Sequence, residues 1–123
     1  MLTILKIEDK QKISAYVNKH NLAMPVEPCQ YMAMSEADTL CGLGALSLVG
    51  DKVYMNFLHT EMGGMQNHGL AKALLNMADL HGIQTVYGSN TDLEELYTLL
   101  RFQKENDEFF LSLKGYFTAA RNC

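Results

Sequence analysis

The sequence lacks several features that would mark particular classes of protein. No uninterrupted apolar run reaches the roughly eighteen residues that a membrane-spanning helix needs, and residues 1–9 lack the apolar core of a signal peptide. The three cysteines, Cys29, Cys41 and Cys123, have spacings that suit neither a disulfide framework nor a zinc site. We therefore expect a cytoplasmic protein in a reducing compartment, with no membrane partner and no metal.

Runs of basic residues are also missing, and the formal net charge is −4. This balance argues against a nucleic-acid partner held by bulk electrostatics. Hydrophobic residues make up 48% of the chain and charged residues 20%, which is typical of a globular domain rather than a disordered segment. At 123 residues the chain is long enough for one core, so we expect a single domain over residues 1–123.

Strand and helix patterns alternate along the chain without a linker or a repeat. Short runs rich in apolar residues predict strands at 3–7, 31–35, 40–49, 52–60, 85–89, 102–105 and 109–113. Apolar positions three and four residues apart predict helices after residue 9, over 70–78 and from residue 91.

Turn and cap residues separate these elements. Gly50-Asp51 predicts a two-residue hairpin turn, His81-Gly82 ends the second helix, and Thr91 with Glu94 forms a capping box for the third. The predicted order is β-α-β-β-β-α-β-α-β-β, and the fold class is α/β (α+β). We expect a central mixed, mostly antiparallel sheet with helices on both faces and a ligand near the strand ends.

The stretch from Gln66 to Ala71 is predicted to be a loop between a strand and the second helix. A loop-to-helix junction points unsatisfied backbone N–H groups at its occupant, and anions bind at such places. Gly69 would allow a phosphate to approach the backbone closely. The same stretch can also be a purely structural helix start with a flexible entry.

This stretch resembles the pyrophosphate-binding loop of the GNAT superfamily of N-acetyltransferases, whose pattern R/Q-x-x-G-x-G/A is met by Gln66, Gly69 and Ala71. A second, independent similarity lies downstream. The family has an asparagine after its fifth strand and then a helix that ends in Y-x-x-x-G-F. Asn90, Tyr97 and Phe102 match that signature, while its glycine is replaced by Arg101. Both signatures and the element order cover residues 30–113, so the chain is similar to a compact GNAT-like domain.

The resemblance implies direct transfer of an acetyl group from acetyl-CoA, as cosubstrate, to a primary amine of a small molecule or peptide. Tyr97 would be the general acid that protonates the departing thiolate, and His59 and Glu61 are the candidates for the general base. The residues that would contact acetyl-CoA are His59, Thr60, Glu61, Gln66, Asn67, His68, Gly69, Leu70, Ala71, Lys72, Asn90 and Tyr97.

The sequence leaves other interpretations of these residues open. Asn90 can be a helix cap, and Tyr97 can be a core residue with a satisfied hydroxyl. The segment between the first helix and the second strand is too short for the second helix with which many members build the acceptor pocket. A non-catalytic acyl-CoA-binding sensor is therefore one alternative. A structural domain, dimeric through the final strands and Phe109-Phe110, is another.

Overall fold

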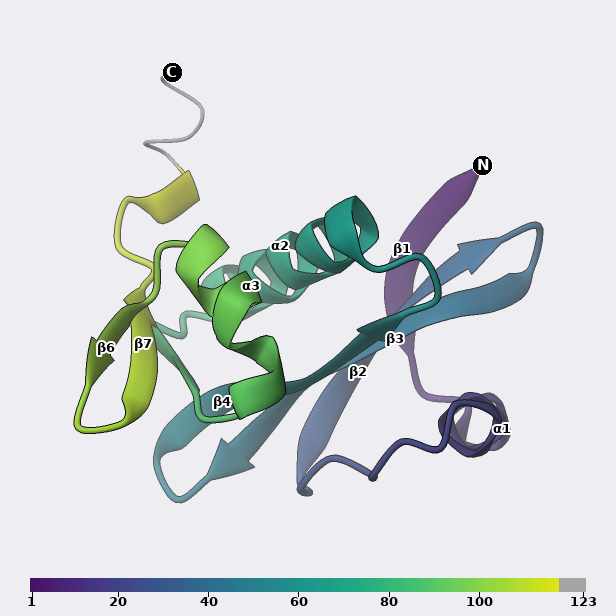
Figure 1. Cartoon of the computed structure of the whole chain (residues 1–123), viewed down its shortest axis with the longest axis horizontal. Coiled ribbons are helices and arrows are strands. Elements are labelled where there is room, and N and C mark those ends of the chain that lie inside the picture. The colour runs from purple at the N-terminus through teal and green to yellow at the C-terminus, as the bar shows by residue number, and fades with distance from the viewer. Residues whose placement is uncertain (118–123) are drawn as a thin grey trace.

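The computed structural model describes residues 1–117, in which seven strands form one sheet (Figure 1). In sequence order the strands are β1 (Leu2–Ile7), β2 (Cys29–Glu36), β3 (Thr39–Val49), β4 (Lys52–Thr60), β5 (Thr85–Gly88), β6 (Gln103–Glu105) and β7 (Glu108–Ser112). Their order across the sheet is β1-β2-β3-β4-β5-β7-β6, and every neighbouring pair is antiparallel except β4 and β5. The predicted mixed, mostly antiparallel sheet is confirmed.

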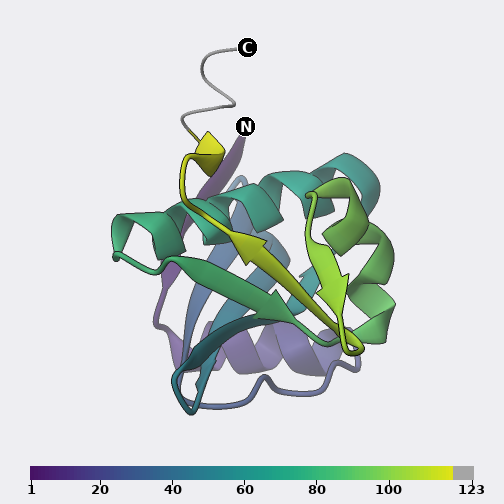
Figure 2. The ribbon, with the colours of Figure 1, turned by 90° about the vertical axis from the view of Figure 1, so that its left-hand side faces the viewer.

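Helices cover both faces of this sheet, as predicted (Figure 2). They are α1 (Lys10–Lys19), α2 (Gly64–Leu80) and α3 (Glu94–Leu99), the last preceded by the short 3-10 helix η1 (Thr91–Leu93). Under α1 lies a small core that includes Ile13 and Phe57. A larger core under α2 and α3 includes Leu74, Val86 and Tyr97. The sheet therefore separates two apolar layers, as its position between the helices requires.

Local signals explain several element ends. The Asp9 carboxylate accepts hydrogen bonds from the backbone N–H groups of Gln11 and Lys12 and so begins α1. Gly50 has a φ of 65° in the hairpin between β3 and β4, which confirms the predicted turn. Arg101 has a φ of 71° directly after α3. The signature's glycine position therefore has a backbone conformation in which a β-carbon is unfavourable.

One predicted boundary and one predicted cap are wrong. The stretch from Gln66 to Ala71 is helical, because α2 begins at Gly64, six residues before the predicted start. The Asn90 side chain, rather than Thr91, caps η1 by accepting a hydrogen bond from the backbone N–H of Asp92. A side chain one position earlier thus satisfies the first free donor, and the alternative interpretation of Asn90 as a cap is confirmed.

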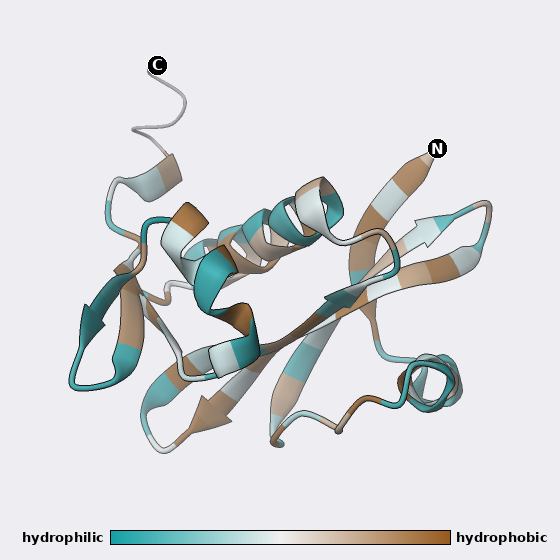
Figure 3. Ribbon diagram, in the orientation of Figure 1, coloured by the Kyte–Doolittle hydropathy of each residue, from teal (hydrophilic) through white to brown (hydrophobic). Residues whose placement is uncertain are grey.

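The final strands give little support to dimerisation through their edge. β6 is the edge strand of the sheet, and its three residues are hydrophilic and exposed (Figure 3). Phe109 is buried in the larger core, where it contacts Tyr97, and Phe110 is half-buried. The homodimer stays a prediction without a specific surface behind it. Cys123 lies outside the described residues, whereas Cys29 and Cys41 are free thiols. In the described part of the chain, no helix is long and apolar enough to cross a membrane.

Candidate functional site

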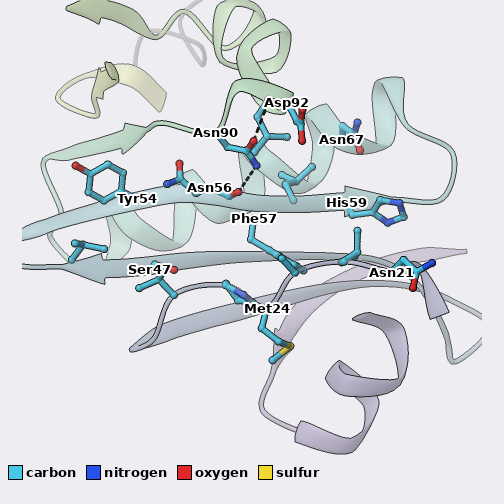
Figure 4. Close-up of a pocket in the computed structure, with 17 residues that line it drawn as sticks. Asn21, Met24, Ser47, Tyr54, Asn56, Phe57, His59, Asn67, Asn90 and Asp92 are labelled. Carbon is cyan, nitrogen blue, oxygen red and sulfur yellow. Dashed lines mark hydrogen bonds between the residues drawn. The ribbon is translucent and has the colours of Figure 1, made fainter. Parts of the chain in front are cut away.

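A fork between β4 and β5 opens a cavity in the molecule. The two strands pair in parallel only at Val53–Val86 and Tyr54–Tyr87, although β4 continues to Thr60. The cavity that opens beyond this point has a volume of about 660 Å³ (Figure 4). Its walls are the segment after α1, the strands β3 and β4, the start of α2 and the turn after β5. The lining residues include Asn21, Met24, Asn56, His59, Asn67, Asn90 and Asp92.

The segment after α1 contributes a wall of the cavity without forming a second helix. No helix occurs between α1 and β2, and residues 21–26 form one wall of the cavity instead. Met24 from this segment and Phe57 from β4 both line the cavity (Figure 4). An acceptor would therefore meet a mostly apolar loop on this side.

Side-chain hydrogen bonds fix the turn between β4 and α2. The buried Thr60 hydroxyl accepts a hydrogen bond from the backbone N–H of Gly63 at 3.0 Å and donates to the side-chain oxygen of Asn67. The side-chain oxygen of Gln66 accepts from the backbone N–H of Met62 at 3.3 Å. Both polar side chains at the start of α2 are thus used to shape the turn.

The start of α2 offers free backbone donors, one turn earlier than predicted. No side chain caps this helix at Gly63. In an α-helix only the first N–H groups lack an acceptor, so those of His68 and later residues are bonded within α2. The donors available to an anion therefore lie from Gly64 to Asn67, with Gln66 already bonded to the Gly63 carbonyl. The backbone N–H groups of His68 to Lys72, residues predicted to contact acetyl-CoA, are therefore not available to it.

Side chains farther along α2 have other surroundings than those predicted for ligand contact. Leu70 and Ala71 are fully buried in the protein core. Lys72 lies over the ring of Tyr116. Gly69 differs, because a β-carbon built there would have no atom within 4 Å. Packing does not explain a glycine at this position.

Tyr97 and Asn90 meet at the base of the fork. The Tyr97 side chain is fully buried, and its hydroxyl donates to the carbonyl oxygen of Met55 at 2.6 Å and lies 3.0 Å from the side-chain oxygen of Asn56. Burial raises the pKa of this hydroxyl. The Asn90 amide donates to the Asn56 carbonyl oxygen at 2.7 Å. Both signature residues thus contact β4 where it leaves β5, and the general-acid role of Tyr97 stays a prediction.

His59 and Glu61 diverge in their surroundings. His59 lines the cavity, and its Nδ1 lies 2.8 Å from the Tyr16 hydroxyl. Burial and the neighbouring His20 lower the pKa of His59. The exposed Glu61 carboxylate instead pairs with His20 at 3.0 Å and with Lys19 at 3.3 Å, which lowers its pKa. Glu61 therefore ties α1 to the end of β4 and does not line the cavity.

The structure brings together some predicted residues and adds others. Of the predicted site residues, His59, Asn67 and Asn90 line the cavity. Asn56 was missed, although a polar residue between apolar neighbours in a strand is a signal. Tyr16 was missed as well, because its spacing from Ile13 and Val17 fits the apolar face of α1. Within residues 1–117 no cluster of histidine, cysteine and acidic side chains is placed to hold a metal ion.

By sequence alone, the chain matches no protein-family profile and no curated protein. By structure, it is similar to an N-acetyltransferase from Staphylococcus aureus Mu50, with a TM-score of 0.74, 15% identity, and coverage of 92% of this chain and 98% of that one. It is also similar to a Bacillus subtilis acetyltransferase in complex with CoA, with a TM-score of 0.66, 15% identity, and coverage of 92% of this chain and 99% of that one. A chain of the KacTA–DNA complex is similar as well, with a TM-score of 0.65 and 15% identity over 100% of both chains. Because that complex contains DNA, the absence of a nucleic-acid partner here stays a prediction.

Proposed function

We propose that this chain, which has the fold of the GNAT acetyltransferases, transfers the acetyl group of acetyl-CoA directly to a primary amine. The observation that carries the proposal is the fork between β4 and β5, with its cavity of about 660 Å³. A cleft of this size, with polar groups converging from several elements, is typical of a small-molecule site. The start of α2 reaches the same cavity through Asn67.

The residues at the start of α2 fit the pyrophosphate of a CoA. The uncapped backbone donors of Gly64 and Met65 and the positive end of the helix dipole favour an anion there. The open space beside Gly69 would let the anion lie close to the helix. Among residues 1–117 no lysine or arginine lines the cavity, so backbone dipoles would carry most of the attraction.

His59 is the better of the two candidate bases. Its lowered pKa favours the neutral ring at pH 7, which can accept a proton from an attacking amine. In one tautomer, Nδ1–H donates to the Tyr16 oxygen while the Tyr16 hydroxyl donates to the Cys41 carbonyl, 3.3 Å away. Nε2 is then free to accept the proton. Glu61, held by His20 and Lys19, serves to position α1.

A second candidate function is binding of an acyl-CoA without turnover. The buried hydroxyl of Tyr97 favours it, because this group already donates to the Met55 carbonyl. For Tyr97 to act as the general acid, its buried hydroxyl would have to give up this hydrogen bond and reach the cavity, which Tyr97 does not line. If it cannot, water would have to protonate the thiolate.

Two measurements separate these functions. Calorimetric titration with acetyl-CoA tests binding, and release of free thiol in the presence of a panel of primary amines tests transfer. We expect binding, and amine-dependent thiol release that His59→Gln reduces about a hundredfold, the lower end of what a general base contributes. Binding without thiol release for any amine would favour the sensor. Absence of binding at millimolar acetyl-CoA would refute both.

A further inference from the structure

The Asn56 side chain closes the fork at the point where β4 and β5 separate. Its Nδ2 donates to the Ser89 hydroxyl at 2.8 Å, and its Oδ1 accepts from the backbone N–H of Ser89 at 2.8 Å. A side chain thus continues the contact between the two strands after the last backbone pair, Tyr54–Tyr87. Asn56 therefore holds a fixed place in the wall of the cavity, where Figure 4 draws it.

The hydrogen bond from the Ser89 backbone N–H fixes the orientation of this amide. A backbone N–H can only donate, so the atom facing the Ser89 N–H must be the Asn56 oxygen. The Tyr97 hydroxyl has one proton, which it donates to the Met55 carbonyl oxygen at 2.6 Å and can share with the same Asn56 oxygen at 3.0 Å. The nitrogen consequently faces away from Tyr97.

One N–H of the Asn56 side chain has no acceptor within residues 1–117. The Asn56 nitrogen carries two N–H groups, and within residues 1–117 only the Ser89 hydroxyl accepts from it. The residue is partly exposed and lines the cavity. A polar N–H held rigidly in a cavity wall can donate to a ligand without reorganisation, which is the arrangement that stabilises developing negative charge most effectively.

We propose that Asn56 is the hydrogen-bond donor to the acyl carbonyl oxygen at the fork, and that Tyr97 positions it. The inference rests on the proposed acetyl transfer. As the amine nitrogen bonds to the acyl carbon, the carbonyl electron pair moves to oxygen, where the Asn56 N–H stabilises the charge. The carbon–sulfur bond then breaks with its electron pair on sulfur, and His59 holds the proton lost by the amine.

Binding of two matched ligands tests the donor directly. S-ethyl-CoA, a thioether, has a methylene group where acetyl-CoA has its carbonyl. A hydrogen bond of ordinary strength predicts that the wild-type protein binds acetyl-CoA about fivefold to tenfold more tightly than the thioether. Asn56→Asp keeps both acceptor contacts but has no N–H, so it should remove the preference. Asn76→Asp makes the same change on α2, outside the cavity, and should keep it.

A second measurement needs no variant. In NMR spectra of the wild-type protein, the Asn56 side-chain amide proton should shift downfield on addition of acetyl-CoA and shift much less with S-ethyl-CoA.

Tyr97→Phe, which leaves the donor but removes one of its supports, should give an intermediate preference between the ligands. Equal shifts with both ligands, or a folded Asn56→Asp protein that keeps the preference, would overturn the inference while leaving the proposed function intact. If neither ligand binds the wild-type protein, both proposals fail.

Discussion

Replacing Gly69 by alanine should raise the stability of the free protein and weaken its binding of acetyl-CoA. Gly69 lies inside α2, and a β-carbon there would have no atom within 4 Å. Alanine in a helix interior is more favourable than glycine by about 0.5 to 1 kcal/mol, because an unfolded chain with alanine has less conformational freedom to lose on folding. For a domain of this size we expect a rise of about 2 to 5 °C in melting temperature.

The same methyl group would occupy the space through which a pyrophosphate approaches α2. We expect the dissociation constant for acetyl-CoA to rise at least about tenfold, which corresponds to about 1.4 kcal/mol. Thermal unfolding without ligand and calorimetric titration with acetyl-CoA measure the two effects. Asn76→Ala, a second substitution that favours the helix, should stabilise α2 without changing affinity. A stabilised Gly69→Ala protein with unchanged affinity would show that the pyrophosphate lies elsewhere, and a destabilised one would refute the open space.

Three other substitutions test the fold and the site. Gly88→Ala should lower the free energy of unfolding by about 3 kcal/mol in urea titrations, because the new β-carbon would lie 2.3 Å from the buried Tyr97 ring; an unchanged value would contradict this packing. Arg101→Gly should raise it by about 1 kcal/mol by relieving the φ of 71°, and a loss of stability would mean that the arginine side chain matters more than the backbone. Because the pKa of His59 is lowered in the folded protein, the unfolded chain binds more protons than the folded one just below about pH 6.5. The free energy of unfolding should therefore fall as the pH drops below that value. His59→Asn should flatten this pH dependence, whereas His68→Asn should keep it.

The strands and hairpins could be predicted because their signals are local. β4 has the predicted bounds, since alternation ends at Gly50-Asp51 on one side and at Thr60 on the other. The start of α2 could not be predicted in the same way. Gly63 and Gly64 have the composition and the positive φ of a turn, yet α2 begins at Gly64. The hydrogen bonds from Thr60 to the turn decide where the helix begins, and they depend on the fold of that segment.

The site was only partly predictable, for a physical reason. The residues found by sequence, such as Asn90 and Tyr97, are fixed by spacing within one short segment. Asn56 acquires its role from Ser89, thirty-three positions away, because two strands stop pairing beside it. The separation of β4 from β5 is a property of the assembled sheet. No spacing within either strand reports where that separation occurs.

The contacts of Tyr97 couple the core to the cavity. Its ring packs between Phe102 and Phe109, with centroids 5.0 and 5.1 Å away, and its hydroxyl reaches β4 at Met55 and Asn56. Because the ring is buried, any shift in its packing moves the support of the Asn56 amide. A core substitution near Tyr97 should therefore alter ligand preference as well as stability, whereas one at Ile13 under α1, which does not line the cavity, should alter stability alone. That difference separates a tyrosine that only fills the core from one that also positions the site.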